Sequence, residues 1–157
     1  HVLISDEQAI AALEEMRRRS GGDRLLAYHQ DGGWTDLSSG AVNAYLAELF
    51  GGAFTAKDFR TWHATVIAAE ALALSAEPGD TQASRRRAER EAIGQVATYL
   101  GNTPTVARSS YIDPRVLDAY AAGTTIAAAT AGSSRSREAR QSRLERSVLE
   151  LLGVGAS

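Results

Sequence analysis

Residues 101–114 of the chain read Gly101-Asn102-Thr103-Pro104-Thr105-Val106-Ala107-Arg108-Ser109-Ser110-Tyr111-Ile112-Asp113-Pro114. Thr103 followed by Pro104 is the pattern of a helix N-cap and its first helical residue, and Asp113 followed by Pro114 repeats it. The stretch therefore predicts a short helix that brings Tyr111 to its end, with a second helix starting soon after. A tyrosine in this place is either a packing residue or a nucleophile, and the interpretation of function depends on which.

Helical signals extend outward from this stretch in both directions. Upstream, caps and apolar periodicity predict helices that follow Ser5, Ser38 or Ser39, Thr55 and Thr81. Downstream, one helix continues from Pro114 through Tyr120, and a last helix runs from Arg135 to about Leu152. Residues 24–28 indicate a short strand or an extended segment before a glycine-rich turn, without a full hairpin. The predicted fold is mainly α, with little β-structure.

Apolar residues recur at helical spacing in two of the upstream helices, which predicts the faces that they bury. The helix after Ser38 or Ser39 would bury a face made of Val42, Tyr45, Leu46, Leu49 and Phe50. The helix after Thr55 would bury Phe59, Trp62, Val66, Ala69 and Leu72 or Ala73. We expect a helical domain over residues 1–122, a pliable linker rich in small residues over 123–134, and a C-terminal helix over 135–157.

Composition excludes several classes of protein. The 157 residues contain no cysteine and three scattered histidines, so we expect neither a disulfide nor a metal site. No apolar run approaches the roughly 20 residues that span a bilayer, and the start lacks a signal-peptide pattern, which predicts a cytoplasmic protein without a membrane partner. Because the chain begins with His1 and not with methionine, we also expect it to be a piece of something longer.

The charge pattern neither excludes nor establishes binding to nucleic acid. The net charge is −2, although DNA-binding surfaces usually carry an excess of basic residues. The basic residues are nearly all arginines, and they gather in clusters that could form a basic face, with Arg108 as a candidate DNA contact. Spacing alone favours a solvated pair of side chains for Lys57 and Arg60, and a structural role for Tyr111.

One set of residues nevertheless has the chemistry for attack on phosphorus: Arg60, Asn102 and Tyr111, with Lys57 nearby. A tyrosine phenol is a weak nucleophile unless cationic groups stabilise the phenolate and the charge that gathers on the phosphoryl oxygens. Arginine suits that task because it stays charged and donates paired hydrogen bonds to a phosphate. Sequence alone does not show that these residues meet.

Two motifs together carry a resemblance to a known family. They are Phe54-Thr55-Ala56-Lys57-Asp58-Phe59-Arg60-Thr61-Trp62 and the later Leu100-Gly101-Asn102-Thr103-Pro104 with Ser110-Tyr111-Ile112. In this order they resemble the catalytic domain of type IB DNA topoisomerases, and the bacterial, poxvirus-like branch most of all. The resemblance runs from about residue 5 to residue 122, and it implies the helical catalytic fold that these enzymes share with tyrosine recombinases.

The resemblance also implies roles for individual residues. Tyr111 would attack a DNA phosphodiester and form a 3′-phosphotyrosyl bond, while Arg60 would hold the non-bridging oxygens of that phosphate. Asn102 stands where many relatives have a histidine, and it would still donate a hydrogen bond to the phosphate although it cannot carry a proton charge near neutral pH. Lys57 and Thr65 would contact DNA.

The implied activity is relaxation of supercoiled double-stranded DNA by a monomeric, nucleoid-associated enzyme. Exchange of a phosphodiester for a phosphotyrosyl ester conserves the bond energy, so neither ATP nor a metal nor another cofactor is implied. The family also uses an upstream arginine and a lysine general acid, which belong before His1. We therefore expect residues 1–157 alone to be inactive or very slow in plasmid relaxation.

Two alternatives remain open from the sequence. A tyrosine recombinase shares the fold and the nucleophile, but usually has His-x-x-Arg where this chain has Lys57-Asp58-Phe59-Arg60. A non-catalytic helical module that binds DNA or a protein would use Tyr111 as a structural residue only. Replacement of Tyr111 by phenylalanine distinguishes the catalytic from the non-catalytic interpretation.

Overall fold

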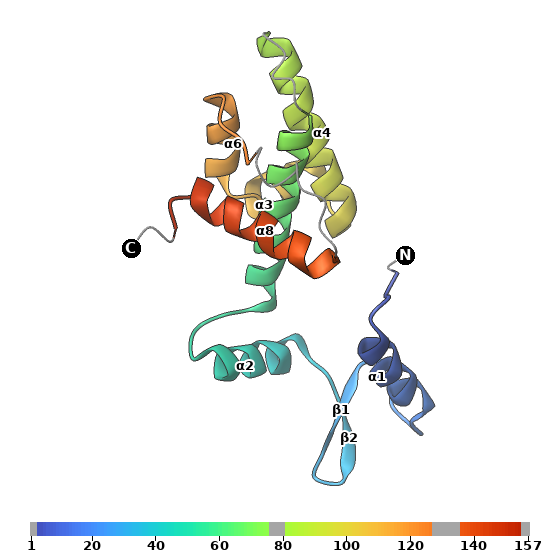
Figure 1. The fold of residues 1–157 in the computed structure, drawn as a ribbon. Coiled ribbons are helices and arrows are strands. Elements are labelled where there is room, and N and C mark those ends of the chain that lie inside the picture. Colours follow the sequence, from blue (N-terminus) through green and yellow to red (C-terminus); the bar gives the residue numbers. More distant parts are fainter. Residues whose placement is uncertain (1–2, 76–80, 127–135, 155–157) are drawn as a thin grey trace. The chain divides into compact units, whose positions relative to one another are not determined.

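The computed structural model describes residues 3–75, 81–126 and 136–154 (Figure 1). These residues form helices and a single two-stranded sheet, which confirms the mainly α prediction. The chain divides into two compact units, His1–Ala56 and Lys57–Ser157, which are described separately below. The predicted domain boundaries at residues 122 and 134 stay a prediction.

The first unit contains helix α1 (Glu7–Arg18), strands β1 (Ala27–Gln30) and β2 (Gly33–Asp36), and helix α2 (Ser39–Phe50). Helix α1 begins one residue later than expected, because Asp6 and not Ser5 is its N-cap: the Asp6 carboxylate accepts from the Ala9 N–H at 2.8 Å. Ser38, one of the two predicted caps, caps α2 in the same way at 3.0 Å.

Strands β1 and β2 form an antiparallel hairpin, so the expectation that residues 24–28 lead into no full hairpin was wrong. His29 pairs with Trp34 and Gln30 with Gly33, which leaves Asp31 and Gly32 as a two-residue loop. Both loop residues have positive φ, 51° at Asp31 and 80° at Gly32. The twist of a two-residue loop with positive φ at both positions matches the twist of the strands, and Asp-Gly is a favoured pair for such a loop.

Little apolar surface is buried in the first unit. Ala27 is its only buried residue among those that the structure describes, and α2 has no buried residue. Tyr45, Leu49 and Phe50, which were predicted to face a core, are between 50% and 63% exposed. These three apolar residues of α2 are therefore exposed, and the prediction that they face a core was wrong.

The second unit contains α3 (Ala56–Leu74), which begins at the boundary, α4 (Gln82–Leu100), α5 (Pro104–Ser110), α6 (Pro114–Ala121) and α8 (Arg137–Leu151). One cluster of buried apolar residues joins these helices. Helix α3 buries Val66, Ala69, Leu72 and Ala73 as predicted, and Trp62 packs against the cluster while partly exposed. Phe59 does not fit the prediction, since it is 40% exposed.

The C-terminal helix α8 belongs to this second core. Its Leu144 and Val148 are at most 1% exposed, and an ion pair between Arg140 and Glu70 joins α8 to α3. Figure 1 shows α8 lying across α3. Of the predicted linker, Ile126 is buried in the same core, whereas residues 127–134 lie outside the described residues. No helix in the described ranges is long and apolar enough to cross a membrane.

Candidate active site

The turn that carries Tyr111 has the local structure that its sequence predicts. Thr103 caps α5 by accepting from the Val106 N–H at 3.3 Å, and Pro104 is the first helical residue. Tyr111 is the C-cap of α5, and its N–H donates to the carbonyl of Ala107 at 3.2 Å. Ala107 is fully buried, so the short helix is fixed against the core by its inner face.

Arg60 of α3 lies over the ring of Tyr111. The guanidinium carbon is 5.3 Å from the ring centroid, within the range of a cation–π contact. Nη2 of Arg60 also donates to the carbonyl of Leu100 at 3.1 Å. Leu100 ends α4, where the helix dipole favours a positive charge. Arg60 is thus held beside Tyr111 and is not merely solvated, which corrects the interpretation from spacing alone.

Asn102 follows the end of α4 directly. Gly101 is the left-handed C-cap, its N–H donates to the carbonyl of Thr98 at 3.3 Å, and the Asn102 N–H donates to that of Ala97 at 2.9 Å. This is the Schellman arrangement, which fixes the main chain of Asn102. Its half-buried side chain makes no hydrogen bond within the described residues, so the amide is available to a ligand.

The three residues expected to contact DNA lie in different environments. Lys57 is exposed in the first turn of α3. Arg108 of α5 is exposed and forms an ion pair with Glu89 of α4. Thr65 is only 2% exposed, and its hydroxyl bonds to main-chain groups of the protein. Burial leaves that hydroxyl no surface on which to meet a phosphate, which corrects the DNA contact expected at Thr65.

A second arginine holds the far side of the Tyr111 turn. The Asp113 carboxylate caps α6 by accepting from the Arg115 N–H at 2.9 Å, and it pairs with the Arg115 guanidinium at 2.7 Å. Nη1 of Arg115 also donates to the carbonyl of Leu152, just after α8. The side-chain hydrogen bond from Arg115 lowers the pKa of Asp113 below its ordinary value, against the opposing effect of burial.

Two of these contacts were missed in the sequence for different reasons. The bond from Arg60 to the Leu100 carbonyl joins residues forty positions apart. Its acceptor is a main-chain atom, so no pattern of side chains in the sequence predicts it. Thr65, by contrast, stands on the apolar stripe of α3 with Trp62 and Ala69. A polar residue on a buried stripe must find hydrogen-bond partners inside the protein, so the stripe itself was a usable signal.

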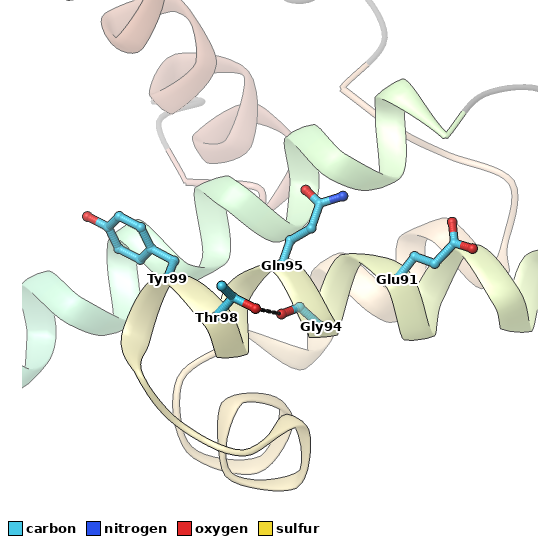
Figure 2. Close-up of a pocket in the computed structure, with 5 residues that line it drawn as sticks. All are labelled: Glu91, Gly94, Gln95, Thr98 and Tyr99. Atoms are coloured by element: carbon cyan, nitrogen blue, oxygen red, sulfur yellow. Dashed lines mark hydrogen bonds between the residues drawn. The ribbon is translucent and has the colours of Figure 1, made fainter. Parts of the chain in front are cut away.

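One pocket of the structure lies apart from the predicted catalytic residues. Figure 2 shows an open depression on α4 lined by Glu91, Gly94, Gln95, Thr98 and Tyr99. None of the residues predicted for catalysis lines this depression. Within the described ranges, no three histidine, aspartate or glutamate side chains gather as metal ligands.

Comparison with known protein families gives a match over residues 6–136, to the family described as the catalytic core of eukaryotic DNA topoisomerase I. The chain belongs to the DNA topoisomerase I family. The matched region covers most of the chain and contains both motifs, Arg60 and Tyr111 included. A search for individual curated relatives gave no match.

Membership in the DNA topoisomerase I family decides the coarse function. The chain is of the type I topoisomerase class of enzymes, which are isomerases that bind and act on DNA. The match is to topoisomerase, the first of the three interpretations that the sequence left open. It does not distinguish among the branches of the family.

Proposed function

We propose that this topoisomerase domain cleaves one DNA strand with Tyr111 as the nucleophile and Arg60 as the group that binds the scissile phosphate. The observation that carries the proposal is the guanidinium of Arg60 over the ring of Tyr111 at 5.3 Å. Arg60 uses one of its five N–H groups on the Leu100 carbonyl. The others can donate to phosphate oxygens close to the tyrosine that would attack the phosphorus.

The chemistry is a transesterification. The Tyr111 oxygen forms a bond to phosphorus as the phenol loses its proton, the bond from phosphorus to the 5′-oxygen breaks, and that oxygen leaves with a proton as a 5′-hydroxyl. Positive charge from Arg60 stabilises the phosphoryl oxygens in the transition state. The 3′-phosphotyrosyl ester conserves the bond energy, so the strand rotates and the 5′-hydroxyl reverses the reaction without ATP or metal. We assign no residue of this site as the proton donor for the leaving oxygen.

Three other residues complete the proposed DNA-binding surface. The free amide of Asn102 donates a hydrogen bond to the scissile phosphate, in place of a histidine. Lys57 contacts a neighbouring phosphate, since it is exposed one helical turn before Arg60. Arg108 contributes less, because a phosphate must first compete with Glu89 for its guanidinium.

We assign the domain to the bacterial, poxvirus-like branch and to type IB chemistry on double-stranded DNA, as a monomer associated with the nucleoid. Support for the branch comes from the Lys57-to-Trp62 motif and from asparagine at position 102. Lysine at position 57 also argues against a recombinase, where histidine is usual.

The test is covalent capture on a duplex whose scissile phosphate carries a bridging sulfur in place of the 5′-oxygen. Sulfur departs as a thiolate, because a thiol loses its proton far more readily than an alcohol, so no general acid is needed. We expect the 157-residue chain to form a slow covalent adduct, separable on a denaturing gel, and Tyr111→Phe to form none.

The matched control is Tyr99→Phe, since Tyr99 is 61% exposed on α4 and outside the site. It should form the adduct at the rate of the unsubstituted chain. An unsubstituted chain that forms no adduct on the sulfur substrate, or a Tyr111→Phe variant that still does, would refute the proposal.

A further inference from the structure

Thr65 is the only buried polar or charged residue among those that the structure describes. It lies on α3, five positions after Arg60, on the side that faces the turn between α5 and α6. Its residual exposure of 2% excludes direct contact with a macromolecular ligand. A hydroxyl buried this deeply must be explained by what it binds inside the protein.

The hydroxyl of Thr65 bonds to the main chain of the turn that carries Tyr111. It accepts from the Asp113 N–H at 3.1 Å, and it donates to the carbonyl of Thr61 in its own helix at 2.8 Å. The carbonyl of Tyr111 is a second, longer acceptor at 3.4 Å. The contacts on the turn thus lie on either side of Ile112, which is itself 4% exposed.

Helix α3 therefore holds Tyr111 at two levels. Arg60 contacts the ring, and Thr65 contacts the main chain at Tyr111 and Asp113. Because both side chains come from one helix, the position of the ring relative to the guanidinium depends on the main-chain contact as well. A nucleophile needs this support, since a displacement of about 1 Å can lower a rate by about 100-fold.

We propose that Thr65 is a positioning residue, which holds the Tyr111 turn on α3 so that the phenol and the Arg60 guanidinium meet the same phosphate. This inference rests on the proposed function of Tyr111. It replaces a DNA contact at Thr65 with a contact inside the protein. It also explains why a threonine occupies a stripe whose neighbours, Ala64, Val66 and Ala69, are apolar.

The test compares Thr65→Val, which removes the hydroxyl and keeps the shape, with Thr65→Ser, which keeps the hydroxyl. The matched control is Thr98→Val on α4. Among the described residues, the Thr98 hydroxyl bonds only the carbonyl of Gly94 in its own helix, at 2.9 Å (Figure 2). The same substitution there removes no hydrogen bond between the helices that the structure describes. Three quantities are measured: single-turnover adduct formation on saturating sulfur substrate, the Kd for DNA, and hydrogen exchange of the Asp113 amide.

We expect Thr65→Val to slow adduct formation by about 10- to 100-fold with the Kd for DNA unchanged, and to speed exchange of the Asp113 amide. Thr65→Ser should restore both to within about threefold, and Thr98→Val should change neither. Thr65→Val with normal adduct rate and normal exchange would overturn the proposal. So would a raised Kd with a normal rate at saturation, because that result indicates a DNA contact.

Hydrogen exchange separates this proposal from the proposed function. If the unsubstituted chain forms no adduct, the function assigned to Tyr111 fails, and the catalytic role of Thr65 fails with it. Exchange of the Asp113 amide would then still report whether Thr65 holds the turn. The adduct can form, and Tyr111→Phe can abolish it, while Thr65→Val changes neither the adduct rate nor the exchange of the Asp113 amide. In that case only the positioning role of Thr65 is refuted.

Discussion

Each compact unit contains an arginine over an aromatic ring, but the two arginines differ in what their remaining N–H groups do. Arg19 lies 6.0 Å from the ring centroid of Trp34, and Arg60 lies 5.3 Å from that of Tyr111. The side chain of Arg19 is 4% exposed, and it donates to the carbonyls of Gly21, Arg24 and Leu25 and to the carboxylate of Asp36. Arg60 makes one hydrogen bond within the described residues, to the Leu100 carbonyl.

The difference separates an arginine that holds a fold from one that is free to bind a ligand. A guanidinium has five N–H donors, and Arg19 directs them at four acceptors of its own unit. In a unit where Ala27 alone is buried among the described residues, such polar contacts take the place of an apolar core. Arg60 lies beside a large core that already holds α3 and α4, so its other donors are not needed for folding.

The largest expected effect is on strand cleavage. Arg60→Lys should slow adduct formation on the sulfur substrate by about 100- to 1,000-fold, because lysine lacks the paired donors that bind two phosphate oxygens. Arg19→Lys should change the rate by less than about twofold, since four of the five N–H donors of Arg19 are engaged within the first unit. Single-turnover rates of both variants check this comparison. Equal losses in the two variants would show that the free donors of Arg60 are not what matters.

The second effect is on the stability of the first unit. Arg19→Lys should lower the free energy of opening of the hairpin by about 2 kcal/mol, because a lysine ammonium cannot reach acceptors spread around a planar fork. Hydrogen exchange of the β1 and β2 amides measures it. Arg24→Lys is the control, since that exposed side chain takes part in none of these bonds and should cost less than about 0.5 kcal/mol. A similar loss in both variants would contradict the role of Arg19.

Local signals in the sequence predicted most of the helices and the place of Tyr111. Thr103 before Pro104 and Asp113 before Pro114 determine the two helix starts through their own side chains, so sequence neighbours suffice. The missed hairpin was also local: Asp31-Gly32 is a favoured loop pair between two short strands. The strands themselves were hard to recognise, because all their residues except Ala27 are exposed and show no buried alternation.

Contacts between distant residues could not be predicted from the sequence. Periodicity shows which side chains share a face of a helix, but not what covers that face, and so the stripe of α2 was wrongly expected to be buried. Main-chain carbonyls make up three of the four acceptors around Arg19, and the acceptor of Arg60 at Leu100 is also a main-chain carbonyl. Every residue carries one, so residue identity cannot reveal which carbonyl an arginine will find.

The third effect is on the stability of the hairpin when alanine replaces Gly21 or Gly22, and it separates contact with Arg19 from the conformational preference of glycine. Gly21 and Gly22 have φ values of 86° and 88°, so alanine at either position is strained by about 1 kcal/mol. At Gly21 a Cβ would meet nothing within 4 Å, whereas at Gly22 it would lie 2.6 Å from Nη2 of Arg19. Because hydrogen bonds hold that guanidinium, Gly22→Ala should destabilise the hairpin by about 1 kcal/mol more than Gly21→Ala. Equal hydrogen exchange in the two variants would show that Arg19 moves aside freely.

The smallest effect concerns Arg115, whose ion pair with Asp113 is more exposed than that of Arg19 with Asp36, at 57% against 4% for the arginine side chains. The pKa of Asp113 is lowered in the folded protein. The ionised pair therefore stabilises the fold above the pKa of the unfolded carboxyl, near 3.9, and this contribution is lost as the pH falls through the lower folded value.

Asp113→Asn keeps an N-cap for α6 and removes the charge, so at pH 7 it should lower the Tm by less than about 3 °C. That difference should shrink as the pH falls from about 3.9 through the lower pKa of folded Asp113, where the carboxyl of the unsubstituted chain becomes neutral as well. Thermal melts from pH 7 to pH 2.5 measure the difference. Asp118→Asn on the same helix is the control, because exposed Asp118 forms no ion pair within the described residues. A Tm difference that stays constant to pH 2.5 would mean that the Asp113 charge does not contribute, and that only its capping hydrogen bond supports the turn after Tyr111.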